Sequence, residues 1–146
     1  MKITSTAFEH NKPIPEKYTC KGEGINPPLV VSGVPETAQS LVLIVDDPDA
    51  PVGLWTHWTA WNIDPKTTEI KENSVPSNAT EGITSAQTNG WHPPCPPSGT
   101  HRYFFKIFAL NTHLDLPSST NPDQLKSAMK SHIIDSAELI GLFSHT

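Results

Sequence analysis

Apolar residues in this sequence gather in short runs that turn-forming residues separate. Four runs, at residues 29–33, 40–46, 55–63 and 102–111, are rich in β-branched or aromatic side chains and are bounded by Pro, Gly, Asn or Asp. This composition and punctuation are typical of β-strands. The run LVLIV at residues 41–45 has no polar alternation, which predicts a central strand covered on both faces.

Only one segment predicts a helix. Asn121 is suited to the N-cap and Pro122 to the first turn, and apolar residues recur at helical spacing from Leu125 to about residue 133. Residues 72–98, rich in Asn, Ser, Pro and Gly, predict a long exposed connection. A parallel α/β sheet would need a helix after nearly every strand, so the pattern predicts a mostly β fold, an antiparallel β-sandwich with a C-terminal helix.

Length, composition and charge narrow the class of protein. A chain of 146 residues predicts a single domain over residues 1–146. Its fifteen prolines and eight glycines stay below the share that signals disorder. The net charge is −5 and Arg102 is the only arginine, so the chain lacks the basic surface that binds nucleic acid.

The expected location follows from two features of the sequence. No stretch approaches the ~20 apolar residues of a membrane span, and the polar segment after Met1 does not resemble a signal peptide. A cytoplasmic location is therefore expected. Cys20 and Cys95 match no zinc or redox spacing, which predicts free thiols, with a long-range disulfide as the alternative.

Polar residues that could act together flank the predicted strands in three segments. The first, DDPDAP at residues 46–51, follows the central strand, so its carboxylates emerge at a strand end; an ordinary Asp-Pro turn is the alternative. The second is WTHW at residues 55–58. On a regular strand His57 shares a face with Thr59 and Trp61, and a hydrogen-bonded core histidine is the alternative to a ligand-binding one.

The third segment, CPPSGTHRY at residues 95–103, opens the most aromatic strand. His101 and Tyr103 share one face of this strand, where both can donate a hydrogen bond to an anion. Arg102 faces the other way and is expected to pair with a carboxylate inside the fold, Asp49 being the first candidate. A purely structural pairing of Arg102 and packing of His101 is the alternative.

Together the three segments resemble the phosphatidylethanolamine-binding protein family, in particular its short bacterial branch, often labelled Raf kinase inhibitor-like. The residues that carry the resemblance are DPDAP (47–51), WTHWTAWN (55–62) and CPPSGTHRY (95–103). Weaker similarity runs from AF (7–8), IP (14–15), YTC (18–20) and PPL (27–29) to AELIG (137–141), so it covers essentially the whole chain.

The resemblance implies a Greek-key-like β-sandwich with a preformed pocket, at one end of the sheet, for phosphate-like or carboxylate groups. Arg102 is expected to give structural support, and the ligand-binding residues carried over are Asp47, Asp49, His57, Pro97, Gly99, His101 and Tyr103. The chain differs from the family pattern in the segment just before the third motif. Relatives are usually glycine-rich there, whereas this chain has WHP at residues 91–93. This stiffer segment is expected to narrow the pocket mouth.

Three functions are compatible with these residues. The first is a non-catalytic binding protein for a small anionic ligand, such as phosphate, a phosphoryl headgroup or a carboxylate, with no cofactor and no metal. The alternative is a metal-dependent or acid/base hydrolase that uses the same His/Asp cluster, although the sequence has no recognised metal or nucleophile motif. The third is a regulator that binds a protein partner, as the kinase-inhibitor label implies. A homodimer is left open.

Overall fold

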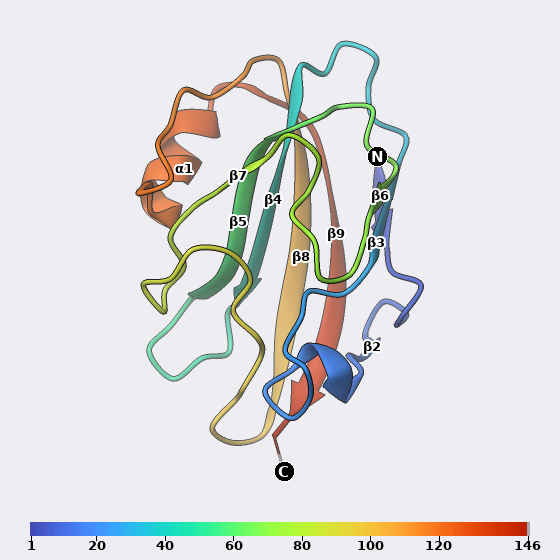
Figure 1. Ribbon diagram of the computed structural model, residues 1–146, viewed down its shortest axis with the longest axis vertical. Coiled ribbons are helices and arrows are strands. Elements are labelled where there is room, and N and C mark those ends of the chain that lie inside the picture. Colours follow the sequence, from blue (N-terminus) through green and yellow to red (C-terminus); the bar gives the residue numbers. More distant parts are fainter. Residues whose placement is uncertain (146) are drawn as a thin grey trace.

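The computed structural model describes residues 1–145, which fold into two β-sheets and one α-helix (Figure 1). In chain order the elements are β1 (Lys2–Thr4), β2 (Lys12–Pro13), the 3-10 helix η1 (Glu16–Tyr18), β3 (Leu29–Ser32), β4 (Ser40–Asp47), β5 (Trp55–Ile63), β6 (Glu69–Ile70), β7 (Thr80–Glu81), β8 (Thr100–Leu110), α1 (Pro122–Met129) and β9 (Ile133–Ser144). The predicted fold class and the four predicted strands are confirmed.

The larger sheet has six strands in the order β2-β9-β8-β4-β5-β7, and the smaller has three in the order β1-β3-β6. All pairings are antiparallel except the short contact of β2 with β9. The main hydrophobic core lies between the two sheets and includes Leu41, Leu43 and Val45 of β4. Val42 and Ile44 face the opposite side, so β4 is buried along its whole length, as the sequence predicts.

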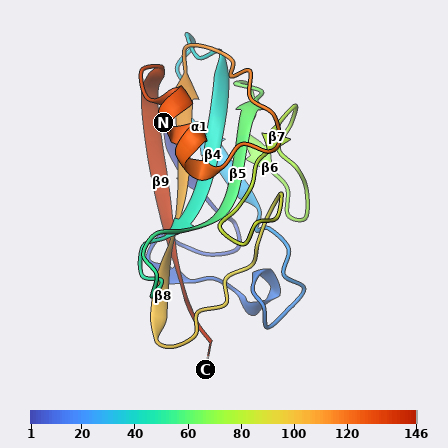
Figure 2. The same ribbon diagram turned by 90° about the vertical axis from the view of Figure 1, so that its left-hand side faces the viewer.

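Helix α1 covers the outer face of the larger sheet, on the side away from β3 and β6 (Figures 1 and 2). It begins with the expected cap: the Asn121 side chain accepts from the Gln124 amide, and the Gln124 side chain accepts from the Asn121 amide. The helix ends at Met129, so the prediction that it reaches about residue 133 is wrong. No helix within residues 1–145 has the length and apolar character needed to cross a bilayer.

The last strand, β9, was not expected from the sequence. It pairs with β8 from Ile133 to Ser144 and completes the larger sheet beside the most aromatic strand. Its first half is largely exposed, whereas Leu139, Gly141 and Phe143 are buried. The alternation of buried and partly exposed positions therefore starts only in the second half, where nearly every residue is apolar.

Strand β5 contains a β-bulge at His57. Along the pairing with β4, Val45 lies opposite Trp58 and the next residue, Asp46, lies opposite Thr56, so His57 has no partner in the register. A bulge turns the extra side chain away from the regular alternation. The expectation that His57 shares a face with Trp61 is therefore wrong: Trp61 packs under α1, and His57 lies edge-on to Tyr103 on the other face.

The connection at residues 72–98 is less exposed than the sequence predicts. It contributes β7, which pairs with β5, and a bridge between Ile83 and Asn89. Trp91 packs against the main core, with its ring 5.6 Å from Trp58 and 6.1 Å from Phe105. This segment therefore forms a wall of the molecule instead of a free loop.

Candidate functional site

A cavity of about 290 Å³ lies where β4, β5 and β8 meet the loops at residues 48–54 and 91–99. This volume is at the lower end of the range of small-molecule pockets. Its lining is largely apolar with a few polar side chains: Asp47, Ala50, Pro51, Val52, Trp55, His57, His92, Pro93, Cys95, Pro96, Pro97, His101 and Tyr103. The three segments singled out from the sequence therefore converge on one cavity.

The buried pair of Asp47 and His101 forms the floor of the cavity. Asp47 ends β4, and its Oδ2 lies 2.6 Å from Nδ1 of His101, near the start of β8. Its other oxygen, Oδ1, accepts the amide of Asp49 at 2.7 Å. Because a carboxylate only accepts hydrogen bonds, Nδ1 of His101 carries a proton and Nε2 is left for a ligand. Asp47 thus orients His101.

His57 is held in one tautomer by the backbone. Its Nδ1 lies 2.8 Å from the carbonyl oxygen of His92, and a carbonyl can only accept, so Nδ1 is the protonated nitrogen. Burial lowers the pKa of His57 from 6.5 to about 4, and this outweighs the opposing contributions of the His92 carbonyl and Asp47. At neutral pH the ring is therefore uncharged and its Nε2 is a hydrogen-bond acceptor.

Tyr103 stands between the two histidines. Its ring centroid lies 5.2 Å from that of His57 and 6.4 Å from that of His101. Burial, together with the negative charges of Asp47 and Asp49, raises the pKa of the phenol above its usual range, so the hydroxyl keeps its proton. Within residues 1–145 this hydroxyl has no hydrogen-bond partner, although the side chain lines the cavity.

The expected pair of Asp49 and Arg102 is present, but it lies outside the cavity. Asp49 Oδ2 accepts from the backbone amide and Nε of Arg102, and Oδ1 accepts from Nη2, each at 2.9 Å. These bonds lower the pKa of Asp49 to about 2. The expectation of a buried pair is wrong, because 52% of the Arg102 side chain is exposed. Asp49 does not line the cavity, and its oxygens are occupied by Arg102.

The loop before β8 meets the cavity through only some of its residues. Pro97 lines the cavity, as expected, together with Pro96. Gly99 does not line it; it adopts a φ of 69°, and apart from its two chain neighbours no other residue among 1–145 comes within 4 Å of where a Cβ would be. Gly99 therefore serves the turn into β8, where a positive φ favours glycine.

The WHP segment forms one wall of the cavity. His92 stacks on His57 at 5.9 Å, and the two residues also exchange a backbone bond from the His92 amide to the His57 carbonyl. Pro93 lies beside it in the lining. His92 was not among the candidate residues, because its carbonyl, not its side chain, orients His57. Trp55 was also not singled out, although it lies in the WTHW motif.

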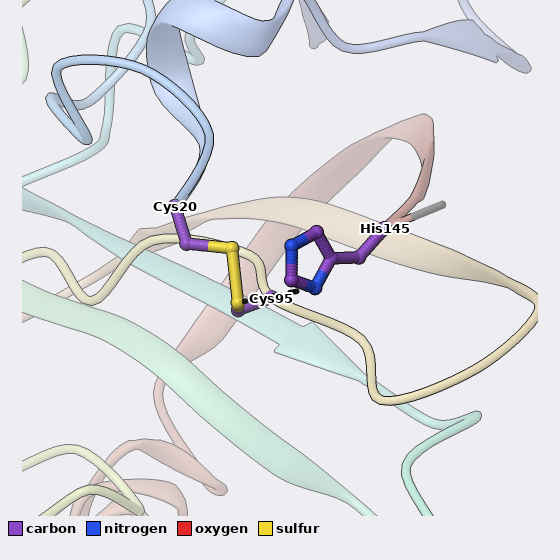
Figure 3. Close-up of side chains that lie close together, drawn as sticks. All are labelled: Cys20, Cys95 and His145. Atoms are coloured by element: carbon purple, nitrogen blue, oxygen red, sulfur yellow. Dashed lines mark hydrogen bonds between the residues drawn. A yellow bond between two sulfur atoms is a disulfide. The ribbon is translucent and has the colours of Figure 1, made fainter.

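Cys20 and Cys95 form a disulfide, so the expectation of free thiols is wrong and the long-range alternative holds. Figure 3 shows the bond joining the segment after η1 to the loop before β8, with the His145 ring beside it. The backbone amide of Cys20 also donates to the carbonyl of Pro94 at 3.1 Å. The cavity wall at residues 93–97 is therefore tied to the N-terminal part of the chain twice.

The two sheets define a β-sandwich, with a cavity where β4, β5 and β8 meet the neighbouring loops. A family model described as phosphatidylethanolamine-binding protein matches residues 4–144, so the chain belongs to that family. The resemblance inferred from the three motifs is confirmed.

Relatives of similar length are found in archaea and bacteria. A UPF0098 protein of Methanothermobacter thermautotrophicus is 45% identical over 148 residues, covering 98% of both chains, and one of Chlamydia trachomatis has the same identity and coverage. Among solved structures, the phosphatidylethanolamine-binding protein homologue CT736 of C. trachomatis has a TM-score of 0.95 at 44% identity, covering 98% of this chain and 96% of its own. YbcL of Escherichia coli has a TM-score of 0.91 at 28% identity, covering 98% and 97%.

Proposed function

We propose that this protein is a non-catalytic binding protein whose pocket takes the phosphate end of a small molecule or of a phosphorylated partner. The observation that carries the proposal is a set of three polar groups in one cavity that have no hydrogen-bond partner within residues 1–145. They are Nε2 of His57, Nε2 of His101 and the hydroxyl of Tyr103. The three side chains are almost fully buried, yet these atoms remain open to the cavity, so a ligand can complete the set.

The character of the three groups favours phosphate over other anions. Tyr103 donates, and His101 donates from Nε2 when it is an imidazolium, whereas neutral His57 accepts. A phosphate group at neutral pH carries both oxygens that accept and, in part of its population, a P–O–H that donates. Sulfate and carboxylate carry no such proton at neutral pH. Either of them would leave the lone pair of His57 facing an anionic oxygen.

An anion can be attracted to this site only by groups inside the cavity. The whole chain carries −5, and Asp47 lies in the cavity lining, so long-range attraction does not draw an anion in. Binding must come from the donors themselves, and an anion beside His101 favours its imidazolium form. We therefore expect modest affinity, uptake of a proton on binding, and weaker binding as the pH rises through the range in which histidine titrates.

The lining also favours binding over covalent catalysis. Among residues 1–145 it contains no serine or threonine, and its one cysteine, Cys95, is in the disulfide. Both oxygens of Asp47 already accept hydrogen bonds, which makes this carboxylate a support for His101 and a poor nucleophile.

Isothermal titration calorimetry of the oxidised protein with inorganic phosphate and with sulfate tests the proposal. Phosphate is expected to bind at about pH 5.5 and more weakly at pH 8, values on either side of histidine's ~6.5. Sulfate is expected to bind at least tenfold more weakly than phosphate. His101→Ala should lose most of the affinity, whereas the matched control His113→Ala, at an exposed position away from the cavity, should keep it. Absence of phosphate binding at both pH values, or full affinity in His101→Ala, would contradict the proposal.

A further inference from the structure

A second cluster of ligand-forming side chains lies beside the pocket. Cys20, Cys95 and His145 come from three distant parts of the chain, and their ligand atoms all lie within 4.8 Å of one another (Figure 3). Nδ1 of His145 is 3.8 Å from Sγ of Cys95. All three side chains are exposed, so an ion from solution can reach them.

We propose that reduction of the Cys20–Cys95 disulfide converts this cluster into a binding site for a thiophilic divalent cation of the zinc class. Two thiolates and one imidazole are ligands that zinc prefers. With Zn–S near 2.3 Å and Zn–N near 2.05 Å, tetrahedral geometry separates the ligand atoms by about 3.5–3.8 Å. The observed distance from Cys95 to His145 already meets this requirement.

The two cysteines remain close when the bond between them opens. Their Cα atoms are 5.4 Å apart, so rotation of the side chains can separate the sulfurs while the backbone stays in place. The bond from the Cys20 amide to the Pro94 carbonyl holds the same two segments together without any help from sulfur. His145 directly follows β9, whose long pairing with β8 places the backbone of this residue beside the loop that carries Cys95.

The oxidation state of the two cysteines decides whether the cation site exists. In the disulfide neither sulfur can become a thiolate, so in the oxidised protein His145 is the one member of this cluster that can bind a cation. A dithiol or phosphine reductant supplies two electrons: the S–S bond breaks, each sulfur takes up one proton, and the reductant becomes a disulfide or a phosphine oxide whose oxygen comes from water. The cation then displaces the two thiol protons. Three protein ligands leave a fourth position for water.

Titration of Co²⁺ into the tag-free protein tests the site, because cobalt bound to thiolate absorbs in the near-ultraviolet and tetrahedral cobalt absorbs strongly in the visible. The phosphine-reduced chain is expected to bind one equivalent with both absorptions, which Zn²⁺ abolishes by displacement. The oxidised chain is expected to show neither. His145→Ala should weaken Co²⁺ binding at least tenfold in the reduced state, and His113→Ala should leave it unchanged.

The proposal is overturned if the reduced chain shows no thiolate absorption with Co²⁺, or if His145→Ala binds Co²⁺ as well as the unaltered sequence. Unfolding of the reduced chain, seen as loss of its far-ultraviolet circular dichroism, would also overturn it, because the site needs the backbone contacts of the folded state. Cys20→Ser gives an independent check. It removes one thiolate without any reductant and should not show the cobalt spectrum of the reduced chain.

Discussion

Between pH 6.5 and pH 4, acidification should lower the free energy of unfolding through His57 more than through any carboxylate. Folding buries the ring and lowers its pKa from 6.5 to about 4. Between these two values the unfolded chain holds a proton on His57 and the folded chain does not, so the stability contributed by the neutral ring is full above pH 6.5 and is lost as the pH falls toward 4. A difference of about 2.5 pKa units corresponds to a loss of about 3 kcal/mol.

The groups that face His57 change its pKa by smaller amounts and do not reverse the lowering. The His92 carbonyl and Asp47 favour the protonated ring, whereas the rings of His92 and His101 oppose it, and Tyr103 packs edge-on beside it as a neutral phenol. Burial remains the largest cause. The lowered pKa of Asp49 acts only below about pH 4, outside the window in which His57 titrates.

Urea denaturation followed by tryptophan fluorescence, at steps from pH 7.5 to pH 4, measures the effect. The same series on His57→Gln isolates His57, because all other titrating groups are common to both chains, including buried Asp46, whose raised pKa gives the opposite slope. The difference between the two curves should change by about 3 kcal/mol across the window. Parallel curves would refute the reasoning, and with it the role of His57 as a neutral acceptor.

Three further outcomes follow from the packing. Replacing both cysteines by serine removes a link across a sequence separation of 75 residues and should lower the free energy of unfolding by about 4 kcal/mol in urea melts; a loss of less than a quarter of this would contradict the loop-entropy argument. Gly141→Ala places a Cβ 2.5 Å from Ile14, which should cost about 1–3 kcal/mol in the same assay, and unchanged stability would show that the contact relaxes freely. Arg102→Ala should lower the melting temperature only slightly, and high salt should erase the difference, because the pair with Asp49 is exposed; a large loss that salt does not affect would show that the pair acts as a buried one.

The sequence predicts the inner strands well because a strand that is buried on both faces consists of a continuous run of apolar residues. Strand β4 contains such an unbroken apolar run and is buried throughout. Strand β9 was not predicted because the exposed residues of its first half are both apolar and polar, among them Ile133 and Glu138, and so show no alternation. Its place in the sheet is decided by pairing with β8, which is a long-range contact.

The parts of the candidate site formed by side chains in motifs could be predicted from the sequence. The parts that depend on a backbone carbonyl, or on residues far apart in the sequence, could not. Asp47, His101 and Tyr103 stand in recognisable motifs at strand ends, and they do meet in one cavity. The contribution of His92 is a carbonyl, which every residue has, so no residue type marks it. The disulfide joins positions 75 residues apart, and spacing along the chain does not reveal that they are neighbours in space.

The bulge in β5 means that the pocket depends on the number of residues in a strand as well as on their kind. His57 is extra to the pairing with β4, whereas the next residues, Trp58 to Ala60, keep partners from Val45 to Leu43. A second, separate shift in register follows between Leu43 and Leu41. Deleting this one residue would join Thr56 to Trp58 and make the ladder regular from Asp47 to Leu43, with the hydrophobic core unchanged in composition. The sandwich would then persist without the buried histidine that lines the cavity, so the loss of one codon would change the cavity lining and leave the scaffold in place.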